Sequence, residues 1–527
     1  MNDEDWVITP EYEDEELHAL PTEEAREQPD RIIGDTKLPK FLEGWVKEAT
    51  NVSHYNEIPA AMTALVLVGQ MCKGFVRIPI KSSIIDSRVH FIWIQTSGTG
   101  KSELMNFVIP VSKGLWDKIN AHHNYREHKY IGPHDKLEQF DNFEVVEYTD
   151  AALIGYQKIV IANETFAEEN VDVEVGDEVW EPVKGSLDGH GLARWDEFTN
   201  SGVFSKTQHK NSIVTYLNTL MNSLGGSSQV ITKKLKEGPV VECHSERSIM
   251  ATTFPPDELD KAITETGLFQ RATVYIWKVP EYIKDEIDEM IVDNFGTFED
   301  VNLPIEKYTE ELFEIYKLTQ ARYLSTSKFD EHGNEIEGPN ATKVVRRGPD
   351  FRDAMRLRMH DLRRMVKAEE GITREAARTF LTRMNIMMGR IAYLCSVVEA
   401  KDIKDPKKQF VVTARNVNQS AFIIRNCYKS LISWFAQSLR VTKSGMAKTI
   451  GAGYLEVYEN LKKTQVRRIN NVDGWVPKKS MMENYRTTKN VSPATGYNHW
   501  DKVEGYFEET KDNRAVFVRL KKEGERK

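Results

Sequence analysis

Cysteine is scarce in this sequence of 527 residues, and the four cysteines lie far apart. Cys72, Cys243, Cys395 and Cys427 include no pair with the spacing of metal ligands, and their arrangement suggests no disulfide framework. The thirteen histidines likewise show no metal-ligand spacing. A reducing compartment therefore fits the chain. We expect it in the cytoplasm.

Long hydrophobic runs are also missing. No apolar run approaches the roughly 20 residues that a membrane-spanning helix needs, so we expect no membrane partner. The N-terminus is acidic, which argues against a secretory signal. The net charge of −9 argues against a uniformly basic, histone-like binder of nucleic acid.

Charged residues are plentiful but unevenly distributed. Residues 1–30 carry twelve Asp or Glu and one Arg, and we expect residues 1–34 to form a disordered acidic arm. Residues 441–527 carry 18 Lys or Arg against 11 Asp or Glu. This basic tail favours a local contact with nucleic acid, and a solvated basic surface explains the charge equally well.

Between these ends, the pattern predicts an α/β chain of roughly three domains. Residues 35–84 carry helical spacing and predict a small N-terminal helical collar. We expect a core of strands and helices over residues 85–295, with an insertion at about 120–190. The insertion is predicted to contain a strand, a helix that starts at the Thr149-Asp150 pair and continues to Ile161, and an acidic surface hairpin. Residues 296–440 predict a helical lid.

The last segment, residues 450–527, predicts three helices followed by two strands, which is the arrangement of a winged helix. A loop rich in Gly, Lys and Thr, residues 441–453, is expected before it. Lys478, Lys479 and Arg486 fall on the second predicted helix and are candidates for contacts with DNA phosphates. The alternative is a winged helix that contacts protein.

The stretch "IWIQTSGTGKSEL" carries the most informative motif. Gly98, Gly100, Lys101 and Ser102 match the end of the G-x-x-x-x-G-K-[ST] pattern, between a strand-like run and a helix-like run. In such a loop, amides point at phosphate oxygens, the lysine neutralises the β- and γ-phosphates, and the hydroxyl holds Mg²⁺. We therefore predict an ATP site, and a chance glycine-rich turn is the alternative. The predicted contacts are Gln95, Thr96, Ser97, Gly98, Thr99, Gly100, Lys101, Ser102 and Glu103.

Gln95 occupies the position of the first glycine in that pattern. If the position requires a positive φ, a residue other than glycine costs on the order of 1 kcal/mol there. This cost is small beside the energy of phosphate binding, so we expect Gln95 to be tolerated.

A carboxylate pair, Asp196 and Glu197, follows a strand-like run in "GLARWDEF". We expect Asp196 to support Mg²⁺ together with Ser102, and Glu197 to orient and activate the attacking water. Arg194 is unusual inside a buried central strand. The alternative is a surface Asp-Glu pair without a catalytic role.

Two further segments add polar residues beside apolar strands. "RSIMATTFPP" ends in Thr252 and Thr253, and Thr253 is our candidate for sensing the γ-phosphate or positioning the water, although threonine commonly ends strands. "GLFQRATVYIW" offers Arg271, which suits a finger that stabilises transition-state charge on the ATP of a neighbouring subunit. A surface arginine at the start of a strand is the alternative.

In this order, the phosphate loop, "WDE", "SIMATTFP" and "GLFQR" resemble a ring-forming AAA+ ATPase of the helicase branch. The segment "QVITKKLKEGPVVECHSERSIMATTFP" resembles the hairpin and sensor strand of minichromosome-maintenance and superfamily 3 helicases. A lysine at the hairpin tip follows single-stranded DNA in those families, and the resemblance assigns this role to Lys233, Lys234 and Lys236. It also implies that residues 85–295 form a P-loop AAA+ core and that residues 374–430 form a lid, with Arg383 as a second sensor arginine.

The resemblance extends over roughly residues 36–435 and is similar to primase-associated helicases of phages and plasmids. It implies an ATP- and Mg²⁺-dependent DNA helicase or translocase that acts on single-stranded or forked DNA during replication of a mobile element or virus. If a virus or plasmid encodes the chain, we expect it in the host cytoplasm. It also implies a homo-oligomeric ring, with a hexamer as the expected size. The sequence carries no primase metal cluster, so a primase or polymerase would be a separate partner. The alternatives are a replication initiator or a protein remodeller that uses ATP without unwinding.

One more segment, residues 343–367, is strongly basic and predicted to be helical. It is a candidate for lining a nucleic-acid path. A solvated helix face is the alternative.

Overall fold

The computed structural model divides the chain into two compact units, Met1–Phe435 and Ala436–Lys527, which are described one at a time. The predicted acidic arm and Lys236 lie outside the described residues. Within the described part, no helix is long and apolar enough to cross a membrane. The structure describes residues 38–52, 56–80, 83–125, 139–145, 149–162, 174–198, 211–222, 230–234, 239–255, 267–293, 303–326, 344–369, 371–469, 472–489, 500, 503–512 and 515–521.

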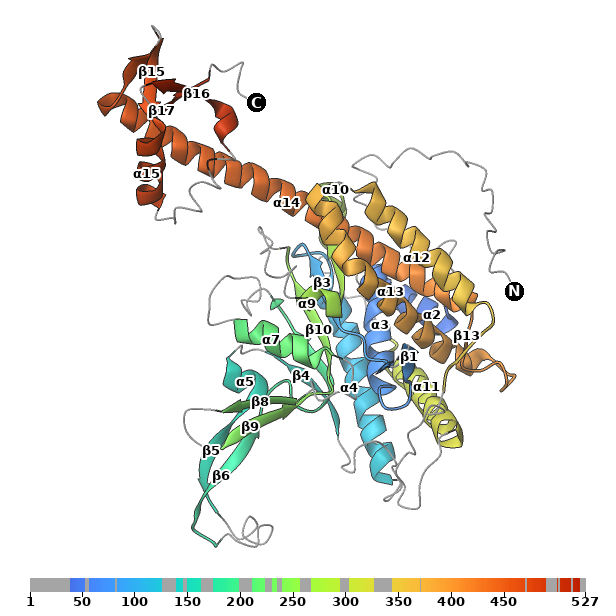
Figure 1. The fold of residues 1–527 in the computed structure, drawn as a ribbon. Coiled ribbons are helices and arrows are strands. Elements are labelled where there is room, and N and C mark those ends of the chain that lie inside the picture. Colours follow the sequence, from blue (N-terminus) through green and yellow to red (C-terminus); the bar gives the residue numbers. More distant parts are fainter. Residues whose placement is uncertain are drawn as a thin grey trace, which may run out of the picture. The chain divides into compact units, whose positions relative to one another are not determined.

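A parallel β-sheet forms the core of the first unit (Figure 1). Its described strands, in the order in which they pair, are β11 (Thr273–Trp277), β3 (Phe91–Gln95), β10 (Ser248–Thr253), β7 (His190–Trp195) and β4 (Phe140–Glu144). Every side chain of β3, β10 and β11 is buried. Strands buried along their whole length are typical of parallel sheets covered on both faces, and the predicted α/β class is confirmed.

Helices from both halves of the first unit cover this sheet. α3 (Glu57–Met71) is buried along its whole length, and α4 (Lys101–Tyr125) begins directly after the loop that follows β3. α13 (Gly371–Glu399) packs against α3 and against α2 (Lys40–Val52), while α11 (Ile305–Thr326) packs against α4. The helices predicted as a collar and as part of a lid therefore share a core with the sheet.

An aromatic cluster joins three of these helices. The ring of Trp45 on α2 lies 4.7 Å from that of Phe107 on α4 and 5.4 Å from that of Tyr308 on α11. Aromatic pairs at such distances add stability beyond the apolar area that they bury. Apart from the strands of two antiparallel hairpins, the other described elements before residue 414 are β1 (Ile78–Ile80), β2 (Ser83–Ile85), α5 (Asp150–Ile154), α7 (Asn211–Leu220), α9 (Leu268–Arg271), α10 (Glu281–Asp293), β12 (Arg346–Arg347), α12 (Phe351–Ala368), η4 (Ala400–Asp402) and β13 (Val411–Val412).

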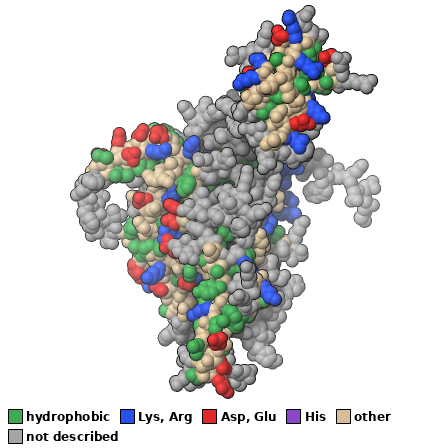
Figure 2. Space-filling model, turned by 90° about the vertical axis from the view of Figure 1, so that its left-hand side faces the viewer, with side chains coloured by type: hydrophobic (Ala, Val, Ile, Leu, Met, Phe, Trp, Pro, Cys, Tyr) green, Lys and Arg blue, Asp and Glu red, His purple; other side chains and the backbone are tan. Residues whose placement is uncertain are grey.

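Two antiparallel hairpins leave the sheet. β8 (Val230–Lys234) pairs with β9 (Val240–His244), as the sequence predicts, and residues 235–238 at the tip lie outside the described part. β5 (Gly155–Ile161) pairs with β6 (Glu178–Lys184). Hydrophobic and acidic side chains gather toward the lower end of the face in Figure 2, where this second hairpin lies.

The start of the β5–β6 hairpin corrects one sequence prediction. A helix was expected to begin at the Thr149-Asp150 pair and to continue to Ile161. Thr149 does cap α5, because its side chain accepts a hydrogen bond from the Ala152 amide. The helix ends at Gly155, however, whose φ of 100° is incompatible with a right-handed helix, and the following residues form β5.

The second unit begins within α14 (Ala414–Thr464) and continues into an antiparallel sheet. α14 includes residues 441–453, so the loop predicted there is wrong. The sheet order is β14 (Arg467–Ile469), β15 (Val472–Pro477), β17 (Ala515–Leu520) and β16 (Phe507–Asp512).

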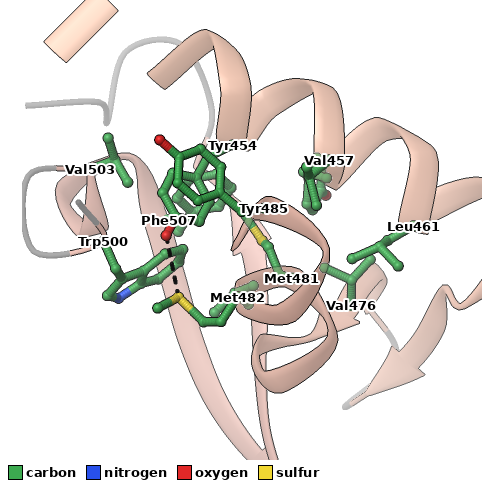
Figure 3. Close-up of a cluster of buried hydrophobic side chains, with 12 residues drawn as sticks. Tyr454, Val457, Leu461, Val476, Met481, Met482, Tyr485, Trp500, Val503 and Phe507 are labelled. Atoms are coloured by element: carbon green, nitrogen blue, oxygen red, sulfur yellow. Dashed lines mark hydrogen bonds between the residues drawn. The ribbon is translucent and has the colours of Figure 1, made fainter. Parts of the chain in front are cut away.

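The sequence predicts this second unit in part. α15 (Lys478–Lys489), β16 and β17 were expected, whereas β14 and β15 were missed. Most of the third expected helix, residues 493–506, lies outside the described part, which includes Trp500 and η5 (Glu504–Tyr506). The described core joins the end of α14, α15 and the sheet (Figure 3).

Aromatic stacking organises that core. The rings of Tyr454 and Tyr485 stack at 3.8 Å, and the Tyr454 hydroxyl donates to the sulfur of Met482 at 3.5 Å (Figure 3). The ring of Trp500 stacks on that of Phe507 at 5.3 Å. The second unit thus has a hydrophobic core of its own.

Candidate functional site

The carboxyl ends of three neighbouring strands, β3, β10 and β7, lie at one edge of the sheet. β3 continues through α4 toward β4 at one side of the sheet, whereas β10 is followed by β11 at the other side. The chain therefore leaves the neighbouring strands β3 and β10 in opposite directions. In open α/β sheets, ligands bind in the crevice outside such a point. The loop 95–103, Thr253 and the Asp196–Glu197 pair all lie at these three strand ends.

The loop between β3 and α4 depends on two glycines. Gly98 and Gly100 have φ angles of 72° and 87°, in the left-handed region that favours glycine. A Cβ added at Gly98 meets no atom within 4 Å. Glycine is therefore required here by the backbone conformation and not by a lack of space for a side chain. Ser97, Gly98, Ser102 and Glu103 are exposed. The open face of the loop can therefore receive an anion, and the amino end of α4 favours negative charge there.

Gln95, at the position of the missing glycine, supports this loop from inside the protein. Its side chain is fully buried, and its Nε2 donates to the Asn56 Oδ1 and to the Thr99 Oγ1, each at 2.8 Å. Its Oε1 accepts from the Trp93 indole nitrogen at 2.7 Å. Asn56 Nδ2 in turn donates to the Thr99 carbonyl oxygen at 2.9 Å. Gln95 has no positive φ, so the strain considered for this position does not arise.

Lys101 closes the loop from the side of α4. Its Nζ donates to the carbonyl oxygens of Gln95 and Thr96 at 2.7 and 2.8 Å. Burial lowers the pKa of Lys101 from 10.5 to about 8, although the negative charges of Asp196 and Glu103 act in the opposite direction. The ammonium group is therefore partly desolvated, and an anion in the loop would favour its charged form.

Asp196 follows β7 and is held from two sides. Its Oδ1 accepts from the Thr252 hydroxyl at 2.7 Å, and its Oδ2 lies 3.5 Å from an Arg194 nitrogen. The side chain is 55% exposed, and its charge raises the pKa of Lys101, so the two groups lie within electrostatic reach. Arg194 also lies 3.7 Å from Glu144. The arginine that was unusual for a central strand therefore organises carboxylates at the strand ends.

Glu197 and Thr253 complete the group at this edge. Glu197 has a φ of 50°, which places a non-glycine residue in the left-handed region. Such strain costs on the order of 1–3 kcal/mol and is concentrated at functional sites. Thr253 ends β10 and is 2% exposed, and its neighbour Thr252 is the threonine that contacts Asp196.

Arg271 and Arg383 lie together, away from the loop. Arg271 precedes β11, and Thr273 of that strand pairs with Phe91 at the start of β3, whereas the loop follows the end of β3. The length of β3 separates these two levels by about 13 Å. Burial lowers the pKa of Arg271, and the positive charge of Arg383 lowers it further.

Hydrogen bonds fix Arg271 in this place. Its Nε donates to the Asn222 side chain at 3.0 Å, and its Nη1 donates to the Asn218 side chain at 3.2 Å and to the Gly267 carbonyl at 3.0 Å. Arg383 on α13 is exposed. Because α13 contacts α9, Arg383 lies near Arg271, at the opposite end of the sheet from Lys101.

The residues predicted to contact DNA have different surroundings. Lys233 lies over the Tyr216 ring at 5.9 Å, and Lys234 is exposed on β8. In the second unit, Lys478 pairs with Glu509 at 2.5 Å, and Lys479 lies 4.0 Å from Glu483. Arg486 is half-buried on α15.

Sequence reasoning missed Asn56 and Thr252, which hold the loop and Asp196. Asn56 directly precedes α3. Nothing in the sequence around it indicates that it contacts the loop between β3 and α4. Thr252 alternates with Thr253 in a threonine pair, and the pleat of β10 decides which of them faces Asp196.

The four cysteines are free and buried, which agrees with the absence of a disulfide framework. Burial raises the pKa of the Cys72 thiol to about 12, so this thiol is unreactive near neutral pH. The chain matches no protein-family model and has no significant match among curated proteins.

Proposed function

We propose that this chain is an ATP-driven DNA helicase or translocase of the AAA+ type, acting as a ring of identical subunits. The observation that carries the proposal is the convergence of the loop with Lys101, the Asp196–Glu197 pair and Thr253 at the ends of three neighbouring strands. A glycine-rich loop, a lysine and adjacent carboxylates at such a crevice are suited to binding and hydrolysing a nucleoside triphosphate.

In this proposal the loop binds the phosphates. Amides of residues 97–102 face the phosphate oxygens, and the Lys101 ammonium exchanges its bonds to the Gln95 and Thr96 carbonyls for bonds to phosphate. Charge-assisted hydrogen bonds of this kind are about twice as strong as neutral ones. The Gln95–Asn56–Thr99 network keeps the loop in its conformation during the exchange.

The residues present fit Mg²⁺ as a cofactor. Among the described residues, no group of three or more His, Cys, Asp or Glu forms a metal cage. Mg²⁺ in nucleotide sites needs one or two carboxylates together with phosphate and water, because it keeps much of its hydration shell. The Asp196 carboxylate and the exposed Ser102 hydroxyl provide such oxygen donors. The ion would neutralise charge on the phosphates.

The remaining side chains act on the attacking water and on the transition state. Glu197, held in its strained conformation beside Asp196, accepts a proton from the water, while Thr253 senses the γ-phosphate. Arg271 and Arg383 reach the ATP of a neighbouring subunit, because they lie at the other end of the sheet from the loop of their own chain. This placement supports a ring, with a hexamer as the proposed size, in which every site combines two chains.

In this ring, the β8–β9 hairpin with Lys233, Lys234 and Lys236 grips single-stranded or forked DNA, and α15 with Lys478, Lys479 and Arg486 offers a second contact. The proposed role is replication of a mobile element or virus in the cytoplasm, beside a separate primase or polymerase. The hairpin lysines would follow phosphates, so movement would be insensitive to sequence.

The test is ATP hydrolysis with and without single-stranded DNA, and strand separation of a fork. We expect DNA to stimulate hydrolysis and the wild-type chain to unwind. Glu197→Gln should retain ATP binding and lose hydrolysis, since the carboxylate that activates water is removed. ATP hydrolysis that DNA does not stimulate, without unwinding, would instead indicate an initiator or protein remodeller.

A further inference from the structure

The outer face of α12 carries basic side chains that the proposed ATP site does not use. Its 18 residues include six Arg or Lys and two Asp, in a chain of net charge −9. Leu362 and Val366 are buried where α12 packs against α13, and Figure 1 shows α12 along the side of α13 that faces away from the sheet. The apolar seam of α12 is therefore already covered.

Helical spacing gathers four of these cations into a line, here termed the α12 stripe: Arg352, Arg356, Arg363 and Lys367. At about 100° per residue, the four fall within about 60° of one another around the helix. At about 1.5 Å per residue, they extend over about 22 Å. All four side chains are exposed.

The protein itself neutralises little of the α12 stripe. Within the described part of the chain, Arg352, Arg363 and Lys367 have no carboxylate within ion-pair distance, whereas Arg356 lies 3.8 Å from the exposed Asp353. The cations on one helix face repel each other, because like charges in such positions are destabilising. An anionic partner would relieve this repulsion.

The lysines of α15 provide a contrast. Lys478 is engaged by Glu509 at 2.5 Å and lies 4.9 Å from the Trp500 ring, and Lys479 lies near Glu483. To bind a phosphate, Lys478 would have to exchange an existing ion pair. Arg352, Arg363 and Lys367 could bind phosphate without such an exchange.

We propose that the α12 stripe binds the phosphate backbone of DNA without regard to sequence. Guanidinium groups match phosphate oxygens in a two-point geometry, and three of the four stripe residues are arginines. A lipid surface fits less well, because a helix lying on a membrane inserts its apolar side, and α13 covers that side here. The identity of the polyanion as DNA rests on the proposed function.

The location also offers a link to the ATP site of a neighbour. α13 follows α12 and carries the exposed Arg374, Arg378 and Arg383. The Arg374 guanidinium donates to the Lys367 carbonyl at 2.5 Å, and Arg383 lies near enough to Arg271 to lower its pKa. DNA on the stripe would therefore contact the helix pair that holds one of the two proposed transition-state arginines.

The experiment compares two variants of the full chain with equal loss of charge. The stripe variant changes Arg352, Arg363 and Lys367 to Gln, and the matched control changes Lys113, Lys307 and Lys317, exposed on α4 and α11, to Gln. Binding of labelled single-stranded and duplex oligonucleotides is measured by anisotropy over a range of salt concentrations. DNA-free ATP hydrolysis and thermal unfolding are measured in parallel to show that both variants are folded.

We expect the stripe variant to bind DNA at least about tenfold more weakly than the control, with unchanged DNA-free hydrolysis. The salt slope should fall by about 0.9 for each duplex phosphate that the variant no longer neutralises, or by about 0.7 for each single-strand phosphate, so the slope of each oligonucleotide reports how many phosphate contacts are lost. Equal binding by the stripe variant and the control would overturn the inference. The acidic residues 1–34 are the other candidate partner of the stripe. A peptide of these residues that binds the wild type and not the stripe variant, while DNA binding is equal in both, would also overturn the inference.

This inference and the proposed function fail in different ways. A chain that binds DNA through the stripe but hydrolyses no ATP would refute the proposed motor and leave the stripe intact. DNA-stimulated hydrolysis and DNA affinity that are both unchanged in the stripe variant would refute the stripe and leave the motor.

Discussion

The two ends of the central sheet use charged residues in different ways. At the amino end, Arg88 is buried, donates to Asp86 at 3.2 Å and donates to the Asn222 carbonyl at 2.7 Å. Lys73 is buried nearby and contacts Glu246. Each of these cations lies in a dense set of partners, which is the condition under which a buried charge can be tolerated.

At the carboxyl end, the same residue types are held less completely. Lys101 is half-buried with a pKa lowered to about 8, Asp196 is 55% exposed, and Glu197 has a strained backbone. A partly desolvated charge such as that of Lys101 and a strained backbone such as that of Glu197 are typical of sites that act on a ligand. The amino end therefore stabilises the fold, and the carboxyl end is where we propose that ATP binds.

The sharpest way to break this comparison is to make one substitution at both ends. Lys101→Met should reduce ATP hydrolysis on the order of 100-fold or more, because a charge aimed at the phosphates is removed. Lys73→Met should instead lower the free energy of unfolding by about 3 kcal/mol, because Glu246 is left without its cation. Hydrolysis per folded molecule and denaturant unfolding distinguish the two results. Equal effects of both substitutions on stability and turnover would remove the distinction between the ends.

Arg271 and Arg383 are the exceptions at the amino end, and subunit mixing tests why they are there. Arg271→Ala and Lys101→Ala should each be inactive alone. Mixed together, they should recover a fraction of wild-type turnover, because some interfaces then join an intact loop to an intact arginine. Hydrolysis of the mixture is compared with that of each variant, and native mass measurement verifies mixed oligomers. Mixed rings without recovery would contradict a role for Arg271 across an interface.

The buried network behind the loop supplies the next test. Gln95→Gly restores the usual glycine of the motif but leaves the Trp93 indole, Asn56 and Thr99 without the bonds that Gln95 makes. Each buried polar group left unsatisfied costs about 1–3 kcal/mol, so we expect lower stability and roughly tenfold weaker ATP binding.

For Gln95→Gly, titration calorimetry measures the affinity for ATP, and thermal unfolding measures the stability. Gln95→Glu is the matched control of equal size: it keeps an acceptor for Trp93 and removes the donor to Asn56. Tighter ATP binding by Gln95→Gly than by the wild type would show that Gln95 is a defect in the motif and not a support.

The parts of this molecule that the sequence predicts well are those that depend on local pattern. The apolar run 91–94, the glycines of the loop and the helix that follows all appear as expected, because strand burial and positive φ leave direct traces in residue type. The β8–β9 hairpin is predicted for the same reason.

The parts that the sequence could not supply depend on tertiary packing. Nothing near Asn56 indicates that it reaches Gln95, and nothing near Arg383 indicates that it approaches Arg271. The basic character of α12 is visible in the sequence. Only the folded chain shows that Glu509 neutralises Lys478 and that, among the described residues, no carboxylate lies within ion-pair distance of Arg352.

The lowered pKa of Lys101 predicts how ATP binding depends on pH. Phosphate raises the pKa of the bound lysine, so above pH 8 binding must take up a proton, and affinity should fall by up to about tenfold per pH unit.

The same pKa shift affects the stability of the ligand-free chain in the opposite direction. Lys101 releases its proton more easily in the folded state, so it destabilises the fold at low pH, and this destabilisation is relieved as pH rises from about 8 toward 10.5. Titration calorimetry at several pH values measures the first effect. Lys101→Met is the control and should lose this pH dependence; a dependence that persists in the variant would assign it to another group.

Substitutions of Glu197 should give the smallest change in stability. They test directly whether the proposed function at the carboxyl end is maintained at a cost in stability. Its φ of 50° is an ordinary angle for glycine and a strained one for glutamate. Glu197→Gly should therefore relieve strain of about 1 kcal/mol, offset in part by the greater freedom of glycine in the unfolded chain. Glu197→Gln keeps the strain and removes only the charge, so it is the matched control. We expect both variants to lose hydrolysis, and Glu197→Gly to unfold at a higher temperature than Glu197→Gln. A lower unfolding temperature for the glycine variant would show that the conformation of Glu197 carries no strain, and that contacts of its side-chain stem, which glutamine retains, stabilise this end of the sheet.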